Sequence, residues 1–231
     1  MLNTLPTNVI PSFLIGLSSV FFGIRGLLHY RRLRSPLSLY YSLCALFVGI
    51  SALFYSLPFV FTQADVPLKT TTIIGDLFYY ATAVMCGRII WYLGLKKRVA
   101  FGWVLAPILA ICTFSLIVFV VDIQQLTYQV VDGLADYPIP PFSSWLMAFI
   151  TLLIIIVAVL TIIQAKVIED ARQRYRLYSI GIAFGLGGIF AIINFLFFQG
   201  NNSSPISIIG YIVAASILFF GLVFVSRRSS R

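Results

Sequence analysis

Charged side chains are scarce in this chain of 231 residues. They make up 10% of it, against 60% apolar and aromatic residues, and the mean hydropathy is +1.01. A soluble domain of this length carries about a quarter charged residues, because water must wet its surface. The shortage of charge excludes a soluble domain and predicts an integral membrane protein. The formal net charge of +9 is then explained by membrane topology, and no nucleic-acid partner is expected.

Metal-binding and catalytic side chains are also few. His29 is the single histidine, which excludes bis-histidine haem and histidine zinc sites. The cysteines Cys44, Cys86 and Cys112 lie in apolar runs without CxxC spacing, so we expect buried thiols rather than a disulfide. The chain contains no HExxH, GxSxG or phosphate-binding loop motif. The sequence therefore predicts a protein that is not an enzyme and holds no metal or haem.

Seven apolar runs are long enough to cross a bilayer, which takes about 20 residues per helix. They span residues 9–29, 37–61, 71–94, 101–121, 143–165, 177–199 and 206–226. We therefore predict a single all-α membrane domain over residues 1–231, a bundle of seven transmembrane helices without a sheet. The first run lacks a cleavage site and is expected to remain as an anchor. The longest connection, 122–142, is predicted to be a loop with room for a short surface helix.

The cations indicate the orientation of the bundle. Thirteen of the sixteen Lys and Arg residues lie in alternate connections or after the seventh run, whereas the opposite connections hold only Lys69 and four aspartates. The positive-inside rule then places the N-terminus outside and the C-terminus in the cytoplasm. We expect cytoplasmic cations to contact anionic lipid or a protein partner. They include Arg31, Arg32, Arg34, Lys96, Lys97, Arg98, Arg172, Arg174 and Arg176.

Small residues recur in the last two runs. Gly181 and Gly185 are four residues apart in the sixth run, and Gly210 lies in the seventh. This spacing places small residues on one helix face, where they allow close approach of a neighbouring helix. We expect these three glycines to make helix contacts, either within the bundle or on a dimerising face.

Three charged residues, Arg25, Asp76 and Arg88, and the amide Asn194 stand out inside the predicted spans, where each is costly without a partner. Arg25 and Arg88 lie near the predicted cytoplasmic side, and their long side chains can reach lipid phosphates there. Asp76 begins a stripe of small and polar residues that continues at Tyr80, and Asn194 is expected at a similar depth near the outer side. Two interpretations follow. Asp76, Tyr80 and Asn194 line an outer ligand pocket, or Asp76 and Asn194 make hydrogen bonds between helices.

One stretch carries a family resemblance. It comprises residues 171–181 (Ala-Arg-Gln-Arg-Tyr-Arg-Leu-Tyr-Ser-Ile-Gly), Gly185, Gly188, Asn194-Phe195, Pro205, Gly210, Ala214 and Arg227-Arg228. These residues resemble the last two helices of the membrane-embedded N-terminal sensor region of prokaryotic histidine kinases and related signalling proteins. The resemblance implies a seven-helix sensor in the plasma (inner) membrane of a prokaryote. In that family the last helix continues into a kinase or cyclase; this chain stops at Arg231, so we expect no output domain.

Three functions remain open from the sequence. The first is a stand-alone sensor that responds to a small apolar ligand or to the membrane and signals to a separate protein. The second is an accessory structural subunit of a larger membrane complex. The third, a small-molecule carrier, has no supporting repeat of prolines in its two halves. A retinal protein is excluded because residues 206–226 contain no lysine to form the Schiff base.

Overall fold

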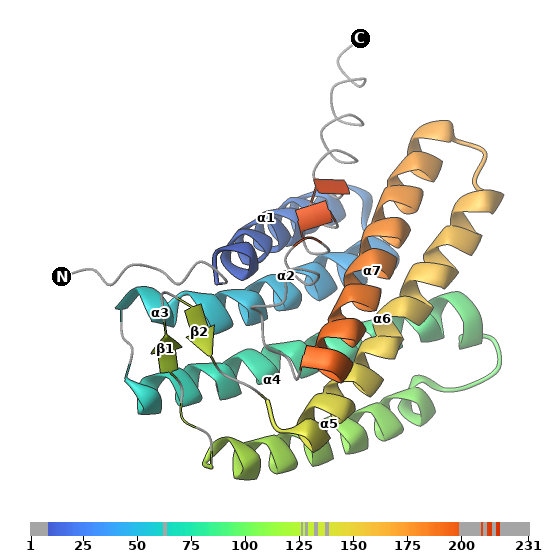
Figure 1. Ribbon diagram of the computed structural model, residues 1–231. Coiled ribbons are helices and arrows are strands. Elements are labelled where there is room, and N and C mark those ends of the chain that lie inside the picture. Colours follow the sequence, from blue (N-terminus) through green and yellow to red (C-terminus); the bar gives the residue numbers. More distant parts are fainter. Residues whose placement is uncertain are drawn as a thin grey trace.

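The computed structural model describes residues 9–61, 64–125, 127, 129–131, 134–136 and 139–198, together with 209, 212, 213, 216 and 217. Six long helices make up most of this part of the chain (Figure 1): α1 Ile10–Leu33, α2 Pro36–Ser56, α4 Asp65–Ile90, α5 Phe101–Ile123, α6 Pro141–Val167 and α7 Ala171–Phe198. A four-residue helix, α3 Pro58–Phe61, follows α2, and a π-helical turn, η1 Trp91–Leu95, extends α4.

All six long helices contain a stretch that is long and apolar enough to cross a membrane. This confirms the first six predicted spans and identifies an integral membrane protein. The predicted seventh span, 206–226, lies outside the described residues except for five positions, which are helical. Gly210 is among the positions outside the described residues.

Two helices begin about one to two turns earlier than the hydropathy pattern predicts. α4 begins at Asp65 rather than at residue 71, because the polar side chains of its first two turns find partners within the same helix. Asp65 pairs with Lys69 at 2.7 Å, and the hydroxyl of Thr70 donates to the carbonyl of Val66 at 2.9 Å. α7 begins at Ala171 rather than at residue 177, with the Arg174 amide donating to the Asp170 carbonyl at 2.9 Å. Hydropathy does not detect polar helical turns that extend beyond the hydrocarbon core.

The connection between α5 and α6 differs from the prediction. Instead of a loop with a surface helix, it contains two short antiparallel strands, β1 Gln129–Val131 and β2 Leu134–Asp136, with Val130 opposite Ala135. The intervening sequence, Asp-Gly, is a strong signal for a tight hairpin turn. The expectation of no sheet is therefore wrong for this connection.

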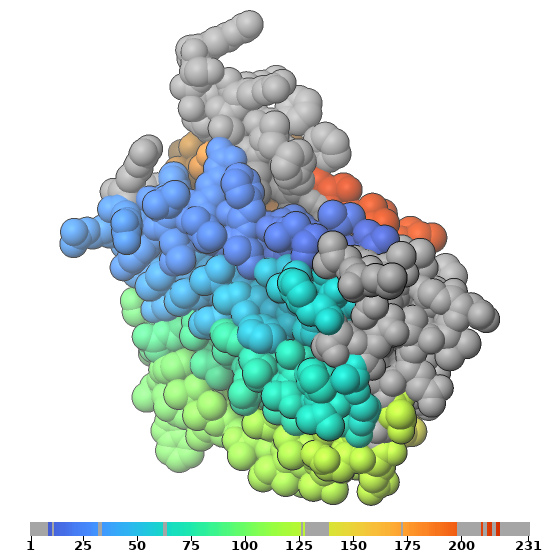
Figure 2. Space-filling view, turned by 90° about the vertical axis from the view of Figure 1, so that its left-hand side faces the viewer, coloured from blue at the N-terminus to red at the C-terminus, as the bar shows by residue number. Residues whose placement is uncertain are grey.

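The helices form a row with a hairpin packed on it. In Figure 1, α1, α2, α4 and α5 follow one another as neighbours, and Figure 2 shows the same order from another side. α6 and α7 pack against each other, and α6 also contacts α4 and α5. The connections α1–α2, η1–α5 and α6–α7 lie toward the right of Figure 1, and we call this the basic end because they carry the clustered cations. The opposite end, with α3, β1 and β2, is the hairpin end.

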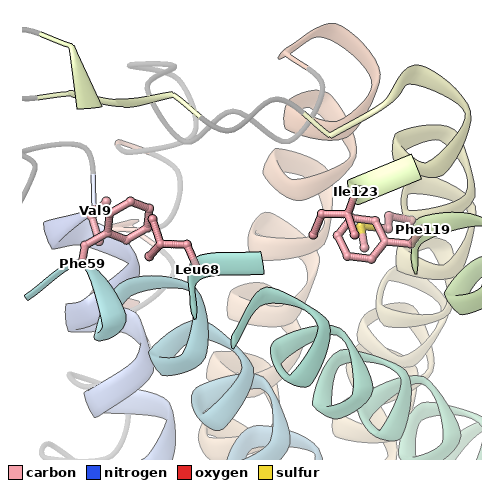
Figure 3. Packing of buried hydrophobic residues seen from close by; sticks show 6 residues of the cluster. Val9, Phe59, Leu68, Phe119 and Ile123 are labelled. Atoms are coloured by element: carbon pink, nitrogen blue, oxygen red, sulfur yellow. The ribbon is translucent and has the colours of Figure 1, made fainter. Parts of the chain in front are cut away.

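Buried apolar side chains form clusters along the bundle. The cluster at the hairpin end joins α3, α4, α5 and α6; Figure 3 shows Val9, Phe59 and Leu68 in one group and Phe119 beside Ile123 in another. A second cluster, toward the basic end, contains Tyr41, Cys44, Cys86, Ile89 and Val157. A third joins α4 to α5 and α6 through Tyr80, Ala83, Ile108, Cys112 and Ile150.

Close backbone approach is most evident between α1 and α2. A Cβ on Gly49 would lie 2.6 Å from the backbone nitrogen of Val20 and 2.8 Å from the carbonyl oxygen of Gly16. α6 and α7 also approach closely, because a Cβ on Gly181 would lie 2.7 Å from Cγ1 of Ile162. Gly185 faces Ala158 at an ordinary contact distance of 3.6 Å. The α1–α2 contact was not singled out in the sequence.

Candidate functional site

Asp76 is fully buried in α4 and bonds to a neighbouring helix. The phenol of Tyr55, on α2, donates a hydrogen bond to Oδ1 of Asp76. The preceding residue makes this possible: a Cβ on Gly75 would lie 2.8 Å from Cε1 of Tyr55, so glycine leaves room for the ring. Oδ2 of Asp76 has no hydrogen-bond partner among the residues that the structure describes. Asp76 thus links α2 to α4, and its second carboxylate oxygen is an acceptor left unused by the described residues.

The other two predicted pocket residues point to different neighbours. The Tyr80 hydroxyl lies 2.9 Å from Oγ of Ser115, on α5. Asn194 is buried in α7, and its Oδ1 has no hydrogen-bond partner within the described part of the chain. Next to it, Ser144 of α6 donates to the carbonyl of Phe195 at 2.6 Å. The Asp76 carboxylate is therefore bonded to α2 and the Tyr80 hydroxyl to α5. The outer pocket of Asp76, Tyr80 and Asn194 stays a prediction.

An apolar groove of about 460 Å³ lies between α2, α3 and α4. Its lining residues are Ile50, Leu53, Phe54, Leu57, Pro58, Phe61, Pro67 and Thr71. The Thr71 hydroxyl is the polar side-chain group in this set, and it donates within its own helix to the carbonyls of Pro67 and Leu68, each at 3.0 Å. The groove therefore offers a ligand only apolar surface.

Local sequence explains why the groove forms there. α2 ends at Ser56, and Leu57 is still helical, with its amide donating to the carbonyl of Leu53 at 2.8 Å. Pro58 has no N–H to donate to the carbonyl four residues earlier, so the helical hydrogen bonding is interrupted there. The chain makes the short α3 and re-enters as α4, whose first turn carries Pro67. The change of direction at the hairpin end separates α2 from the start of α4.

The groove adjoins the buried aspartate through one turn of α2. Phe54 lines the groove and stacks on Phe78 of α4, with ring centroids 5.7 Å apart and planes at 10°. The next residue, Tyr55, bonds to Asp76. Movement of this turn would change both the groove and the buried hydrogen bond.

Two further tyrosines join helices deeper in the bundle. The hydroxyl of Tyr41, on α2, bonds to that of Thr161 on α6, and the hydroxyl of Tyr79, on α4, bonds to that of Thr151 on α6. No sequence pattern identified these residues or Tyr55 as helix contacts. A signal was present, because the hydroxyl of a tyrosine buried within a span needs a partner.

The buried cysteines include one close pair. Cys44 on α2 and Cys86 on α4 are free thiols whose sulfur atoms lie 3.7 Å apart. Cys112 is also a buried free thiol and belongs to the cluster between α4 and α5. The structure agrees with buried thiols, but the contact between two of them depends on packing and was not anticipated.

The predicted cytoplasmic cations gather at the basic end. Arg31 and Arg34 are exposed at the end of α1, and Lys96, Lys97 and Arg98 are exposed after η1. Arg34 adopts a left-handed backbone conformation, with φ of 50°, that ends the helix. Arg32 lies in the last turn of α1, and Arg172, Arg174 and Arg176 lie in the first turns of α7.

Comparison with protein-family models, with curated proteins and with solved structures finds no match to this chain. The resemblance to the sensor region of histidine kinases stays a prediction.

Proposed function

We propose that this protein is a membrane-embedded receptor for a small apolar ligand, which binds in the groove between α2, α3 and α4. The groove carries the proposal. Its volume of about 460 Å³ is in the range of small-molecule sites, and its lining is apolar. The bound state is then passed to a separate protein partner at the basic end.

The membrane restricts the kind of ligand. Lipid tails compete for any apolar groove, so hydrophobicity alone gives no preference for a ligand inside a bilayer. Selectivity must come from van der Waals fit, which favours a compact, rigid molecule over a flexible acyl chain. The ligand class we propose is therefore a compact apolar compound without charged groups.

A route for the signal runs along α2. A ligand that contacts Phe54 acts on the turn that holds Tyr55 against Asp76. At its other end α2 carries Tyr40, which contacts Arg88 of α4, and Tyr41, which bonds to α6. A small displacement of α2 would change contacts with both helices near the basic end.

The proposal includes the orientation and the seventh span. With the basic end in the cytoplasm, as the positive-inside rule requires, the groove opens in the outer half of the membrane. A seventh helix over 206–226 then returns the C-terminus to the cytoplasm. The membrane would be the plasma membrane of a prokaryote, in keeping with the resemblance.

The test is a thermal-shift screen of compact apolar compounds and lipids against the purified protein. A compound at one hundred times its dissociation constant stabilises by about 2.7 kcal/mol. Thr71→Phe fills the groove and should abolish this shift. Thr70→Phe is the matched control: Thr70 is exposed on another face of the same turn and makes the same kind of bond within the helix, so the shift should persist.

Asp76→Asn separates ligand contact from structural coupling. Asp76 is buried, so the unfolding temperature of this variant without ligand should be lower than that of the wild type. Asp76 does not line the groove, so the ligand should still stabilise the variant. Loss of the ligand shift in Thr70→Phe as well as in Thr71→Phe would contradict binding in the groove.

An accessory structural subunit is the second candidate. One observation favours it: Tyr55 donates a hydrogen bond to Asp76 between two helices, which gives the buried carboxylate a structural role without a ligand. If no compound shifts the wild-type protein and it co-purifies stoichiometrically with another membrane protein, the receptor proposal fails and the subunit stands.

A further inference from the structure

The guanidinium of Arg88 is held among aromatic rings inside a membrane-spanning segment. Its Cζ lies 4.2 Å from the ring centroid of Phe101, 4.6 Å from that of Trp91 and 5.4 Å from that of Tyr40. Nε of Arg88 also donates to the Tyr40 hydroxyl at 3.2 Å. Cation–π contacts of this kind position a cation but do not neutralise it.

The side chains of Arg88 and Lys96 extend toward each other along the helix. Arg88 reaches toward the basic end, because Trp91 lies three residues further along and Phe101 is the first residue of α5. Lys96 reaches in the opposite direction, since its Nζ lies 4.8 Å from the ring centroid of Tyr92, four residues earlier.

The rings between the two cations touch each other. Tyr92 meets Tyr40 edge to face, with centroids 6.0 Å apart. Both cations therefore rest on one aromatic pair, Arg88 on Tyr40 and Lys96 on Tyr92.

The rings are fixed before any ligand arrives. Nε1 of Trp91 donates to the carbonyl of Val99 at 2.7 Å, which ties the turn after η1 back to the helix. Trp91 also packs edge to face on Phe101, with centroids 5.6 Å apart. These contacts join the end of α4 to the start of α5.

Neither cation has a counter-charge in the described part of the chain. No carboxylate of the described residues lies within 4.0 Å of Arg88 or Lys96. A guanidinium has five N–H donors, and Nε provides one. The four donors on the Nη atoms of Arg88 have no hydrogen-bond acceptor among the described residues, and the side chain is only half-buried. A cation at this depth is costly unless an anion meets it.

We propose that Arg88 and Lys96 bind the phosphate of one anionic phospholipid, drawn from the membrane leaflet at the basic end. The planar guanidinium suits two phosphate oxygens at once, and Lys96 adds a second, mobile point charge. A zwitterionic lipid fits less well because its own cationic headgroup would lie near Lys96. The site is at the opposite end of the bundle from the groove and does not depend on the proposed ligand.

The test counts bound lipid. The protein is equilibrated in micelles with phosphatidylglycerol or phosphatidylcholine, and native mass spectrometry measures how many molecules of each remain attached. The wild type should retain one phosphatidylglycerol with clear preference over phosphatidylcholine. Arg88→Gln should weaken this binding by more than tenfold, since it removes a charge-assisted bidentate contact. Lys96→Gln should weaken it about fivefold, the effect of one cation near an anionic surface.

Lys97→Gln is the matched control, because Lys97 is an adjacent exposed cation of the same charge. It should bind phosphatidylglycerol as the wild type does. Equal loss in Lys96→Gln and Lys97→Gln would show a diffuse charge effect and overturn the site. Displacement of the lipid by millimolar inorganic phosphate would also overturn it, in favour of a free-phosphate site. If Arg88→Gln does not fold, Arg88→Lys and Lys96→Gln are measured instead. Phosphatidylglycerol affinity equal to that of the wild type in both variants would contradict the proposal.

Discussion

The direction of the hydrogen bond between Tyr41 and Thr161 predicts that mutating the acceptor and mutating the donor cost different amounts of stability. Both residues are buried, and Oγ1 of Thr161 already donates to the carbonyl of Val157 at 2.6 Å. A threonine hydroxyl carries one hydrogen, so it must accept from Tyr41. Tyr41 is the donor, and Thr161 is its acceptor.

Removing the acceptor should cost more than removing the donor. Thr161→Val keeps the side-chain volume but strands the buried hydroxyl of Tyr41, an unpaired donor that costs about 1–3 kcal/mol. Tyr41→Phe removes the donor and leaves Thr161 bonded to Val157, so it should cost about 0.6 kcal/mol, the average for hydrogen bonds between helices in a membrane. Both variants keep the ring that stacks on Phe184 at 6.2 Å.

The double variant makes the test decisive. Replacing both partners with apolar groups of the same shape leaves nothing unpaired, so the double variant should be more stable than Thr161→Val alone. The free energy of unfolding of all four proteins is measured in detergent micelles, in a double-mutant cycle. Thr161→Ser, which keeps the acceptor, serves as the control. If Tyr41→Phe costs more than Thr161→Val, or if the two effects simply add, the assigned direction is wrong.

Two further predictions concern packing and orientation. Gly181→Ala should destabilise by about 1–3 kcal/mol through overpacking, whereas Gly185→Ala should change stability little, because the added Cβ would lie 2.7 Å from Ile162 in the first case and 3.6 Å from Ala158 in the second. Equal effects on the unfolding temperature would show that the α6–α7 contact is looser than described. A reporter inserted within 96–98 should be cytoplasmic and one near residue 132 external; the reverse result in a reporter-activity assay would invert the proposed topology.

Hydropathy predicts the six described spans because a lipid-facing helix must be apolar along most of its length. It does not predict where α4 begins, since Thr70 satisfies its hydroxyl within the helix and lets a polar segment stay helical. The sequence also identifies Asp76 as a group that needs a partner. The partner itself, Tyr55, depends on the rotation of α2 against α4, which no local pattern contains.

The groove likewise depends on how the helices pair, which no local sequence pattern contains. Pro58 and Pro67 are visible in the sequence as helix punctuation, but the space between them exists only once α2 and α4 are paired. The sequence also does not identify the partners of the stripe from Asp76 to Tyr80, because these two residues bond to different helices, α2 and α5.

The pairing of helices has a consequence for how the protein is made. α1 packs extensively on α2, and α6 on α7, and in each pair the two helices are consecutive and joined by a very short connection. Each pair can close as soon as its second helix enters the membrane, without waiting for the rest of the chain. α4 contacts α2, α5 and α6, so it joins the two finished pairs, together with the direct bond from Tyr41 of α2 to Thr161 of α6. Chains divided within 122–142 and produced together should therefore still find each other in the membrane, with α4 on the first half supplying the surface that receives α6.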